Sequence, residues 1–252
     1  MNERFDILER IIKEKCGKKP IYYLPNSGNW GDSLIRHGTI KFLNDKGIKY
    51  KVLSKKKRDW IIPRIRGGNL LYGGGGGWCN LWNHSQEYVN KYKKWLNVIV
   101  LPSTYESDYS DSSVTFFSRD LYESKDNIQD SIFCHDMAFY IQDDFYTGEV
   151  GSGEGYFFRT DSESSNMIAL PDNNFDLSLM GKHTTDVTDF FNEINNYKVI
   201  YTDRLHVAIA GCLLKKEVHM YLGSYFKSKA VYLSSINKRF DNVTFHENFD
   251  TP

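Results

Sequence analysis

The sequence has few cysteines, no long apolar run and no metal-ligand spacing, and each absence excludes a class of protein. Cys16, Cys79, Cys134 and Cys212 are far apart and form no C-x-x-C pair, so we expect reduced, buried thiols. No apolar stretch approaches the roughly 18 residues of a transmembrane helix. The segment 1–19 is charged throughout, unlike a signal peptide, and we therefore expect a cytoplasmic protein.

The chain as a whole also has no net charge. Lysine and arginine together number 32, and so do aspartate and glutamate, so no global field favours a nucleic acid partner. The basic run 55–58 is interpreted as a solvated face or loop. His84, His135, His183 and His219 have no metal-ligand spacing with carboxylates or cysteines, and we expect neither a metal nor a bound cofactor.

Short apolar runs alternate with helix-like patterns along the chain, which predicts an α/β fold with parallel sheets covered on both faces. Glycines crowd together between residues 148 and 155, where we expect a hinge or a linker. The prediction is therefore an N-terminal domain over residues 1–147 and a smaller domain over residues 148–252. The expected strands include 21–24, 48–53, 69–72, 98–101, 114–117, 156–158, 198–201 and 218–222.

The stretch Thr202-Asp-Arg-Leu-His206 is the most informative one, because it lies where a strand ends and a helix begins. Helix N-termini there present free N–H groups to ligands of α/β proteins. Arg204 can bind a carboxylate or phosphate with two hydrogen bonds, and His206 can move a proton near neutral pH. The structural alternative is that Asp203 is only a helix cap and that its neighbours form a solvated edge.

A second polar stretch, Asn29-Trp-Gly31-Asp32, follows the first expected strand. Asp32 is either an N-cap or a carboxylate that orients or deprotonates a hydroxyl. The stretch has neither the G-x-G-x-x-G spacing of a dinucleotide site nor the Lys-Ser/Thr ending of a P-loop.

Glycines 73–77 follow another strand, and they either form a nest for an anion, leave room for substrate, or make a mobile loop. Arg119 and Arg159 each close an expected strand, where they bind an oxyanion or form a surface ion pair. Lys227 follows the last strand within Ser224-Tyr-Phe-Lys.

Five stretches together resemble the polysaccharide pyruvyl transferase family. They are Gly-Asp-x-Leu-Ile at 31–35, the glycine-rich turn at 73–77, Phe-Ser-Arg-Asp at 117–120, Thr-Asp-Arg-Leu-His at 202–206 and Ser-Tyr-x-Lys at 224–227. The resemblance spans about residues 20–235. Val207 and Phe226 depart from it, since the family usually has glycine at the first position and often at the second.

The resemblance implies two Rossmann-like domains with parallel sheets facing a cleft, similar to B-type glycosyltransferases. It implies phosphoenolpyruvate as co-substrate and donor, and a sugar diol as acceptor. The products would be a pyruvate ketal and phosphate, in the synthesis of capsule, exopolysaccharide or cell-wall polysaccharide. The sugar acceptor is expected to be either free or linked to a lipid. The enzyme could then act at the inner face of the membrane and associate with it peripherally.

On this reading the residues divide into three groups. His206 is the expected acid or base at the donor, and Asp32 is the residue expected to serve the acceptor hydroxyl. The expected donor-binding residues are Arg204, Arg159, Arg119, Lys227, Ser224 and Tyr225. The expected acceptor-side residues are Asn29, Gly31, Gly74, Gly75 and Gly76.

Two other functions stay open at this point. One is a nucleotide-sugar-dependent glycosyltransferase of the same architecture, which would bind a nucleoside diphosphate through the same helix N-terminus. The other is a non-catalytic relative that binds a glycan or an anion.

Overall fold

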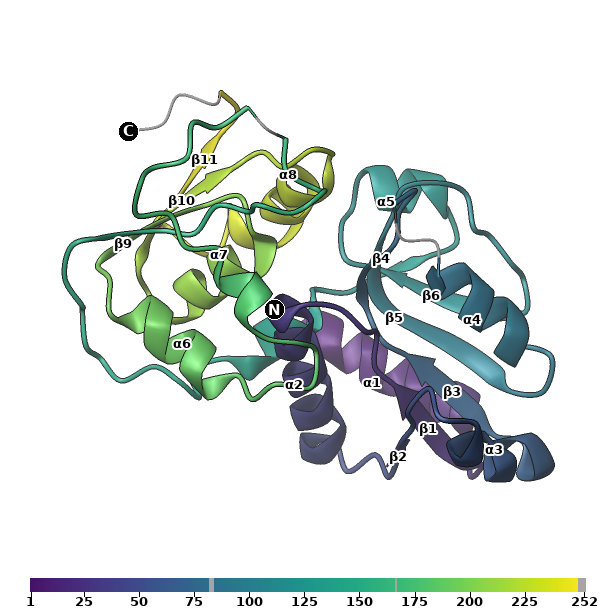
Figure 1. The fold of residues 1–252 in the computed structure, drawn as a ribbon. Coiled ribbons are helices and arrows are strands. Elements are labelled where there is room, and N and C mark those ends of the chain that lie inside the picture. The colour runs from purple at the N-terminus through teal and green to yellow at the C-terminus, as the bar shows by residue number, and fades with distance from the viewer. Residues whose placement is uncertain (82–83, 166, 249–252) are drawn as a thin grey trace. The chain divides into compact units, whose positions relative to one another are not determined.

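The computed structural model describes residues 1–81, 84–165 and 167–248 (Figure 1). The chain forms two compact units, each with its own parallel sheet. The first unit contains Met1–Asn26 and Gly38–Tyr140, and the second contains Ser27–His37 and Ile141–Pro252. The predicted α/β class with parallel sheets is confirmed.

The first unit contains a seven-stranded parallel sheet in the order β2-β1-β3-β5-β6-β7, with β4 paired to β5. The strands are β1 (Ile21–Leu24), β2 (Lys51–Val52), β3 (Asn69–Tyr72), β4 (Gly75–Trp78), β5 (Asn97–Tyr105), β6 (Val114–Ser118) and β7 (Ile132–Phe133). The helices are α1 (Asn2–Cys16), α2 (Trp30–Asp45), η1 (Lys57–Trp60), α3 (Ile61–Arg66), α4 (His84–Tyr92), α5 (Glu123–Asn127) and η2 (Met137–Ile141). The start of α2 belongs to the second unit.

Both faces of this sheet are buried, as its continuous apolar strands require. Leu70 and Val98 face a core shared with Val89 of α4, whereas the alternate residues Leu71 and Ile99 are equally buried on the other side. Side chains alternate between the faces of a strand, so strands without polar alternation must be covered on both faces.

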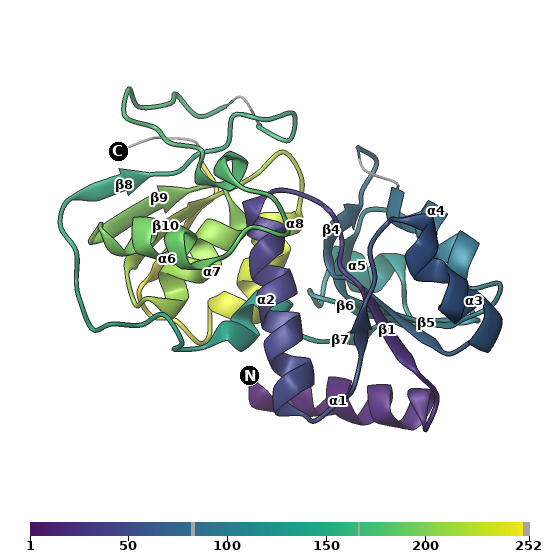
Figure 2. The ribbon, with the colours of Figure 1, turned by 60° about the horizontal axis from the view of Figure 1, so that its bottom comes forward.

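The second unit contains a four-stranded parallel sheet in the order β11-β10-β9-β8. Figure 2 shows β8, β9 and β10 of this sheet. Its strands are β8 (Glu154–Tyr156), β9 (Val199–Thr202), β10 (Glu217–Tyr221) and β11 (Val243–His246). Its helices are η3 (Leu177–Met180), α6 (Thr188–Asn195), α7 (Leu205–Leu213), α8 (Lys227–Val231) and the π-helical turn η4 (Tyr232–Ile236). Within α7 every residue except His206 is buried. Because β9 and β10 are parallel neighbours joined by α7, their C-terminal ends lie at the same edge of the sheet.

The start of α2 packs on the second unit, although the predicted division placed residues 27–37 in the first domain. Trp30 Nε1 donates a hydrogen bond to the carbonyl of Asp186 at 2.8 Å, and the Trp30 ring meets Phe190 edge-on. The Ser33 hydroxyl donates to the carbonyl of Thr185. The sequence pattern could not indicate this, because the partners lie about 150 residues away.

The predicted linker at 148–155 lies within the second unit and is tied down there. The buried Lys216 ammonium donates hydrogen bonds to the carbonyls of Glu149, Val150 and Asn195 at 2.9–3.1 Å. A buried lysine that is satisfied by three carbonyls fixes this segment to the unit. The chain passes from one unit to the other at Tyr140, seven residues before the predicted boundary.

Within the described part of the chain, none of the helices combines the length and apolar character that crossing a bilayer requires.

Most of the glycine-rich segment is part of the sheet, which contradicts the mobile-loop alternative for residues 75–77, and the expected acceptor-side role of these glycines stays a prediction. Gly75 to Trp78 form β4, and most of these glycines are buried. A side chain at Gly74 would place its Cβ 2.3 Å from the carbonyl oxygen of Pro102, and one at Gly73 would lie 2.3 Å from the nitrogen of Asn26. Glycine is required here because neighbouring backbones approach so closely.

We predict that Gly74→Ala destabilises the first unit by about 2–3 kcal/mol, because the sheet must shift to relieve the contact with Pro102. Urea unfolding followed by tryptophan fluorescence measures the change. Gly223→Ala is the matched control, since its added Cβ would meet its nearest neighbour at an ordinary 3.5 Å. Equal stability of the two variants would contradict the account.

Candidate anion-binding and active site

The motif Thr202-Asp203-Arg204 fastens the end of β9 to the segment after β8. The Thr202 hydroxyl donates to the carbonyl of Phe157 at 2.7 Å and accepts from the Arg204 amide at 2.9 Å. The Asp203 carboxylate accepts from the Arg159 amide at 2.8 Å, and burial raises the pKa of Asp203. Thr202 and Asp203 therefore have a structural role: they bring Arg159 and Arg204 to one place.

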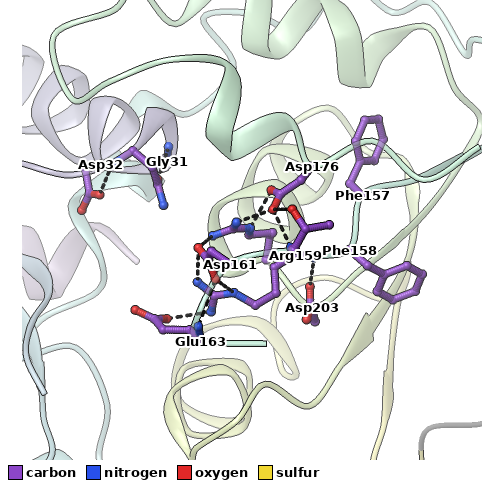
Figure 3. Close-up of polar contacts among 12 residues, drawn as sticks. Gly31, Asp32, Phe157, Phe158, Arg159, Asp161, Glu163, Asp176 and Asp203 are labelled. Carbon is purple, nitrogen blue, oxygen red and sulfur yellow. Dashed lines mark hydrogen bonds and ion pairs between the residues drawn. The ribbon is translucent and has the colours of Figure 1, made fainter. Parts of the chain in front are cut away.

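Arg159 is 5% exposed and its guanidinium is bound by two carboxylates (Figure 3). Its Nε and one terminal nitrogen donate to Asp161 at 2.9 and 3.2 Å, and the other terminal nitrogen donates to Glu163 at 2.6 Å. The Lys227 ammonium donates to the same oxygen of Glu163 at 2.7 Å. Two cations therefore share one carboxylate oxygen, each through a charge-assisted hydrogen bond.

Arg204 is 4% exposed and pairs with Asp176 through two parallel hydrogen bonds of 2.9 and 2.6 Å. Its remaining terminal nitrogen lies 2.9 Å from Asp161, so Asp161 bridges Arg204 and Arg159. These contacts join six residues, which we call the cation–carboxylate cluster. Its members are Arg159, Arg204, Lys227, Asp161, Glu163 and Asp176.

Three cations and three carboxylates balance within this cluster, and the cations lower the pKa of two of the acids, Asp161 and Glu163. Burial alone would raise the pKa of Asp161, but the hydrogen bond from Arg159 and the charges of both arginines outweigh it, and the pKa is lowered. The same competition lowers the pKa of Glu163, where Lys227 and Arg159 outweigh burial. The most exposed carboxylate is that of Asp161, with a 27% exposed side chain, against 11% for Glu163.

Tyr225 and Ser224 lie beside this cluster along the chain. The Lys227 ammonium lies 4.9 Å from the centre of the Tyr225 ring, so the tyrosine is within cation–π distance of it. Ser224 is exposed, three residues after β10 ends at Tyr221. Both residues therefore stand at the edge of the sheet where the cations gather.

His206 and Asp32, the two expected catalytic residues, are connected through Gly31. A Cβ on Gly31 would lie 2.6 Å from His206 Nδ1, so the start of α2 lies directly against this histidine. Asn29 and Asp32 hold the turn, because Asp32 accepts from the Asn29 amide at 3.0 Å and the Asn29 side chain accepts from the Gly31 amide at 2.8 Å. Figure 3 shows Gly31 and Asp32 at the start of this helix. Asp32 thus holds this turn. Its alternative role, as a carboxylate that orients or deprotonates a hydroxyl, stays a prediction.

Arg119 does not join the cation–carboxylate cluster, and its expected role in donor binding stays a prediction. It lies in the first unit, is 1% exposed and pairs with the buried Asp136 at 2.7 Å. Its Nε donates to the Thr104 hydroxyl at 2.8 Å. A buried arginine at the end of a strand looks the same in sequence as one that binds a ligand, and only its partners separate the two.

Of the expected acceptor-side residues, Gly74, Gly75 and Gly76 lie in the first unit, whereas Asn29 and Gly31 lie in the second. Gly74 and Gly75 are buried, and Gly76 is half-buried. They pack the backbone of β4 and its neighbours, as described above, and no open anion nest is formed by the buried pair.

The carboxylates of the cluster were not predicted. The alternation Arg159-Thr-Asp161-Ser-Glu163 was a usable signal, since an arginine with acids two and four residues later can fold back on them. Asp176 gave no such signal, because it reaches Arg204 across 28 residues of chain.

In the described residues, no group of three or more histidines, cysteines or acids is arranged to hold a metal ion.

Comparison with known proteins places this site in a family. The polysaccharide pyruvyl transferase family profile matches residues 29–224, which is 196 of the 252 residues. The chain belongs to this family. The match runs from Asn29 to Ser224 and so includes the start of α2, the cluster's arginines and His206.

A solved structure shares the fold of the whole pyruvyl transferase chain. It is that of a functionally uncharacterized protein from Klebsiella pneumoniae subsp. pneumoniae NTUH-K2044, with a TM-score of 0.80 and 26% sequence identity. The alignment covers 98% of this chain and 100% of that one. No curated protein matches the chain significantly.

We predict that the stability of the second unit falls in acid as Glu163 and Asp161 protonate. The pKa values of Glu163 and Asp161 are lowered in the fold, so their stabilisation is complete above the unfolded values of 4.5 and 3.8. It is lost as pH falls through the lower folded values. Melting temperatures measured from pH 7 to pH 3 report this.

Glu163→Gln tests the assignment. We expect a lower melting temperature at pH 7, because Lys227 and Arg159 lose an ionised partner, and a shallower fall in acid. Glu149→Gln is the control, because Glu149 is exposed and belongs to no ion pair among the described residues. An acid profile of Glu163→Gln that matches the wild type would contradict the assignment.

Proposed function

We propose that this transferase moves the pyruvyl group of phosphoenolpyruvate onto two hydroxyls of a sugar and releases phosphate. The observation that supports the donor is the meeting of Arg159, Arg204 and Lys227 at one edge of the second sheet. Phosphoenolpyruvate has a phosphate and a carboxylate on one three-carbon frame, and such a donor needs several charge-assisted partners. Two guanidinium groups supply planar pairs of donors, and an ammonium adds a point charge.

When phosphoenolpyruvate binds, it must replace at least one carboxylate of the cation–carboxylate cluster. Because three acids already neutralise the three cations, a multiply charged anion gains little unless at least one acid moves away. Asp161 is the proposed first group to leave, since it is the most exposed acid of the cluster and touches both arginines. Asp176 stays as the bidentate support that orients Arg204.

The proposed reaction has three bond changes at C2 of the donor. A sugar hydroxyl oxygen adds to C2 while C3 takes up a proton, the C2–O bond to phosphate breaks, and the neighbouring hydroxyl oxygen closes the ketal. Of the two hydroxyl protons, one is balanced by the proton gained at C3 and the other leaves with phosphate. His206 is the proposed acid and base at the donor, and Asp32 is the proposed acceptor of the sugar proton.

Their placement supports these roles. His206 lies two residues after Arg204, and the turn that carries Asp32 lies against it through Gly31. A donor held by the arginines would therefore meet a proton-transfer group from α7 and a carboxylate from α2. Holding both reactants in register contributes up to roughly 7–11 kcal/mol to such a reaction.

The direct test is phosphate release from phosphoenolpyruvate in the presence of a panel of synthetic and lipid-linked glycosides. We expect release that depends on an acceptor with two neighbouring hydroxyls. Stabilisation by nucleoside diphosphate sugars but not by phosphoenolpyruvate would favour a glycosyltransferase. Binding of phosphoenolpyruvate without release on any glycan would favour a non-catalytic relative.

We predict that Arg204→Lys weakens phosphoenolpyruvate binding by about 10- to 100-fold, because lysine keeps the charge but cannot be oriented by a two-bond pair with Asp176 while it donates to the substrate. Titration calorimetry measures the affinity, and the melting temperature checks the fold. Arg10→Lys is the control, as Arg10 forms an exposed pair with Glu14 on α1. Unchanged affinity of Arg204→Lys would remove Arg204 from the donor site.

We predict that His206→Gln lowers kcat by about 10²- to 10⁴-fold, while the donor affinity stays within about threefold. Single-turnover phosphate release and calorimetry separate the two quantities. His183→Gln in the same unit serves as the control. Near-normal turnover of His206→Gln would show that the proton comes from another group.

A further inference from the structure

A patch on the first unit combines exposed isoleucines with exposed cations. It consists of Lys55, Lys56, Lys57, Arg58, Ile61, Ile62, Arg64, Ile65 and Arg66, and we call it the basic–apolar patch. It covers η1 and α3, and α3 lies at the periphery of the first unit (Figure 1). The proposed reaction uses none of these residues.

The segment is firmly attached, so its outward residues keep their direction. Trp60 is buried and stacks on Tyr92 with ring centres 3.7 Å apart and planes 1° from parallel. Its Nε1 donates to the carbonyl of Ser54 at 2.8 Å, and Pro63 is also buried. Trp60 and Pro63 therefore point inward, and the remaining residues of the two short helices must face outward.

The outward residues include three isoleucines with unusual exposure. Ile61 is 58% exposed, Ile62 46% and Ile65 79%. Ile61 and Ile65 are one helical turn apart and share a face of α3. Isoleucine is among the most often buried residue types, so three exposed isoleucines within five residues indicate a surface that is covered when the protein works.

The cations around them are largely unpaired. Segment 55–66 has six lysines and arginines and a single acid, Asp59, a net charge of +5 in a chain with no net charge overall. Arg58 lies 3.8 Å from Asp59, and Lys55 and Arg64 lie over the rings of Tyr88 and Trp95.

For Lys56, Lys57 and Arg66, no carboxylate within ion-pair distance is found among the described residues. These three cations are free to meet an external anion.

We propose that the basic–apolar patch binds the surface of an anionic lipid membrane. Cations pair with the headgroups while the isoleucine side chains enter the boundary between headgroups and acyl chains, as in interfacial amphipathic segments. A membrane explains both halves of the patch. A nucleic acid would use the cations and leave three isoleucines in water, and it would favour aromatic side chains for stacking, which here point inward.

The test is flotation of the full-length protein with vesicles of phosphatidylglycerol and phosphatidylcholine, and with vesicles of phosphatidylcholine alone. We expect binding to the anionic vesicles that weakens with salt. Replacing Lys56, Lys57 and Arg66 by glutamine should lower this binding about 100-fold. Replacing Ile61 and Ile65 by serine should lower it at least tenfold without altering its salt dependence.

Two matched variants control for lost charge and lost apolar surface. Lys198, Lys215 and Lys238 are exposed lysines of the second unit, and their triple glutamine variant should float like the wild type. Leu179→Ser with Met180→Ser removes two exposed apolar side chains elsewhere and should also have no effect. This test measures binding to vesicles and not phosphate release, so the outcome of the test is independent of the proposed reaction.

Two results would overturn the proposal. One is no flotation of the wild type at low salt. The other is equal flotation of the isoleucine variant and the wild type, together with tight binding of a single-stranded RNA measured by fluorescence anisotropy, which would assign the patch to nucleic acid.

Discussion

The constraint on which the second unit depends is the burial of two arginines beside the end of one strand. A buried guanidinium without partners is prohibitively unfavourable, so Arg159 and Arg204 require the carboxylates that surround them. Those carboxylates fix the long connection between β8 and α6, because Asp161, Glu163 and Asp176 all belong to it. Charge pairing therefore fixes this segment alongside the apolar packing of Phe158 and Leu177.

The same pairing gives the site its proposed chemistry. Arginines that are held rigid and charged by acids are prepared for an external anion, and the anion need only replace the most exposed of those acids. The pyruvyl transferase family membership rests on the match over residues 29–224, and the identity of the donor is our proposal. The membrane surface proposed for η1 and α3 is a separate property, which would bring the enzyme to glycans carried on lipid.

The sequence predicted the strands of continuous apolar character well, and three of the cations that it singled out, Arg159, Arg204 and Lys227, meet in one cluster. Ile21–Leu24 and Asn69–Tyr72 form strands with the predicted bounds, because buried parallel strands are marked by apolar runs between breakers. Local pattern could not show that residues 27–37 pack on Thr185 and Asp186. Nor could it separate Arg119, which closes a core ion pair, from Arg159 and Arg204, since all three follow a strand. For the five glycines the sequence left a nest, room for substrate and a mobile loop as alternatives, because glycine gives no apolar signal even where close backbone packing requires it.

The most direct measurement is a crystal structure of the protein with phosphoenolpyruvate bound. The account predicts the donor's anionic groups within hydrogen-bond distance of Arg159, Arg204 and Lys227, with Asp161 turned away and Asp176 still paired to Arg204. Phosphoenolpyruvate bound elsewhere, with the cation–carboxylate cluster intact, would contradict it.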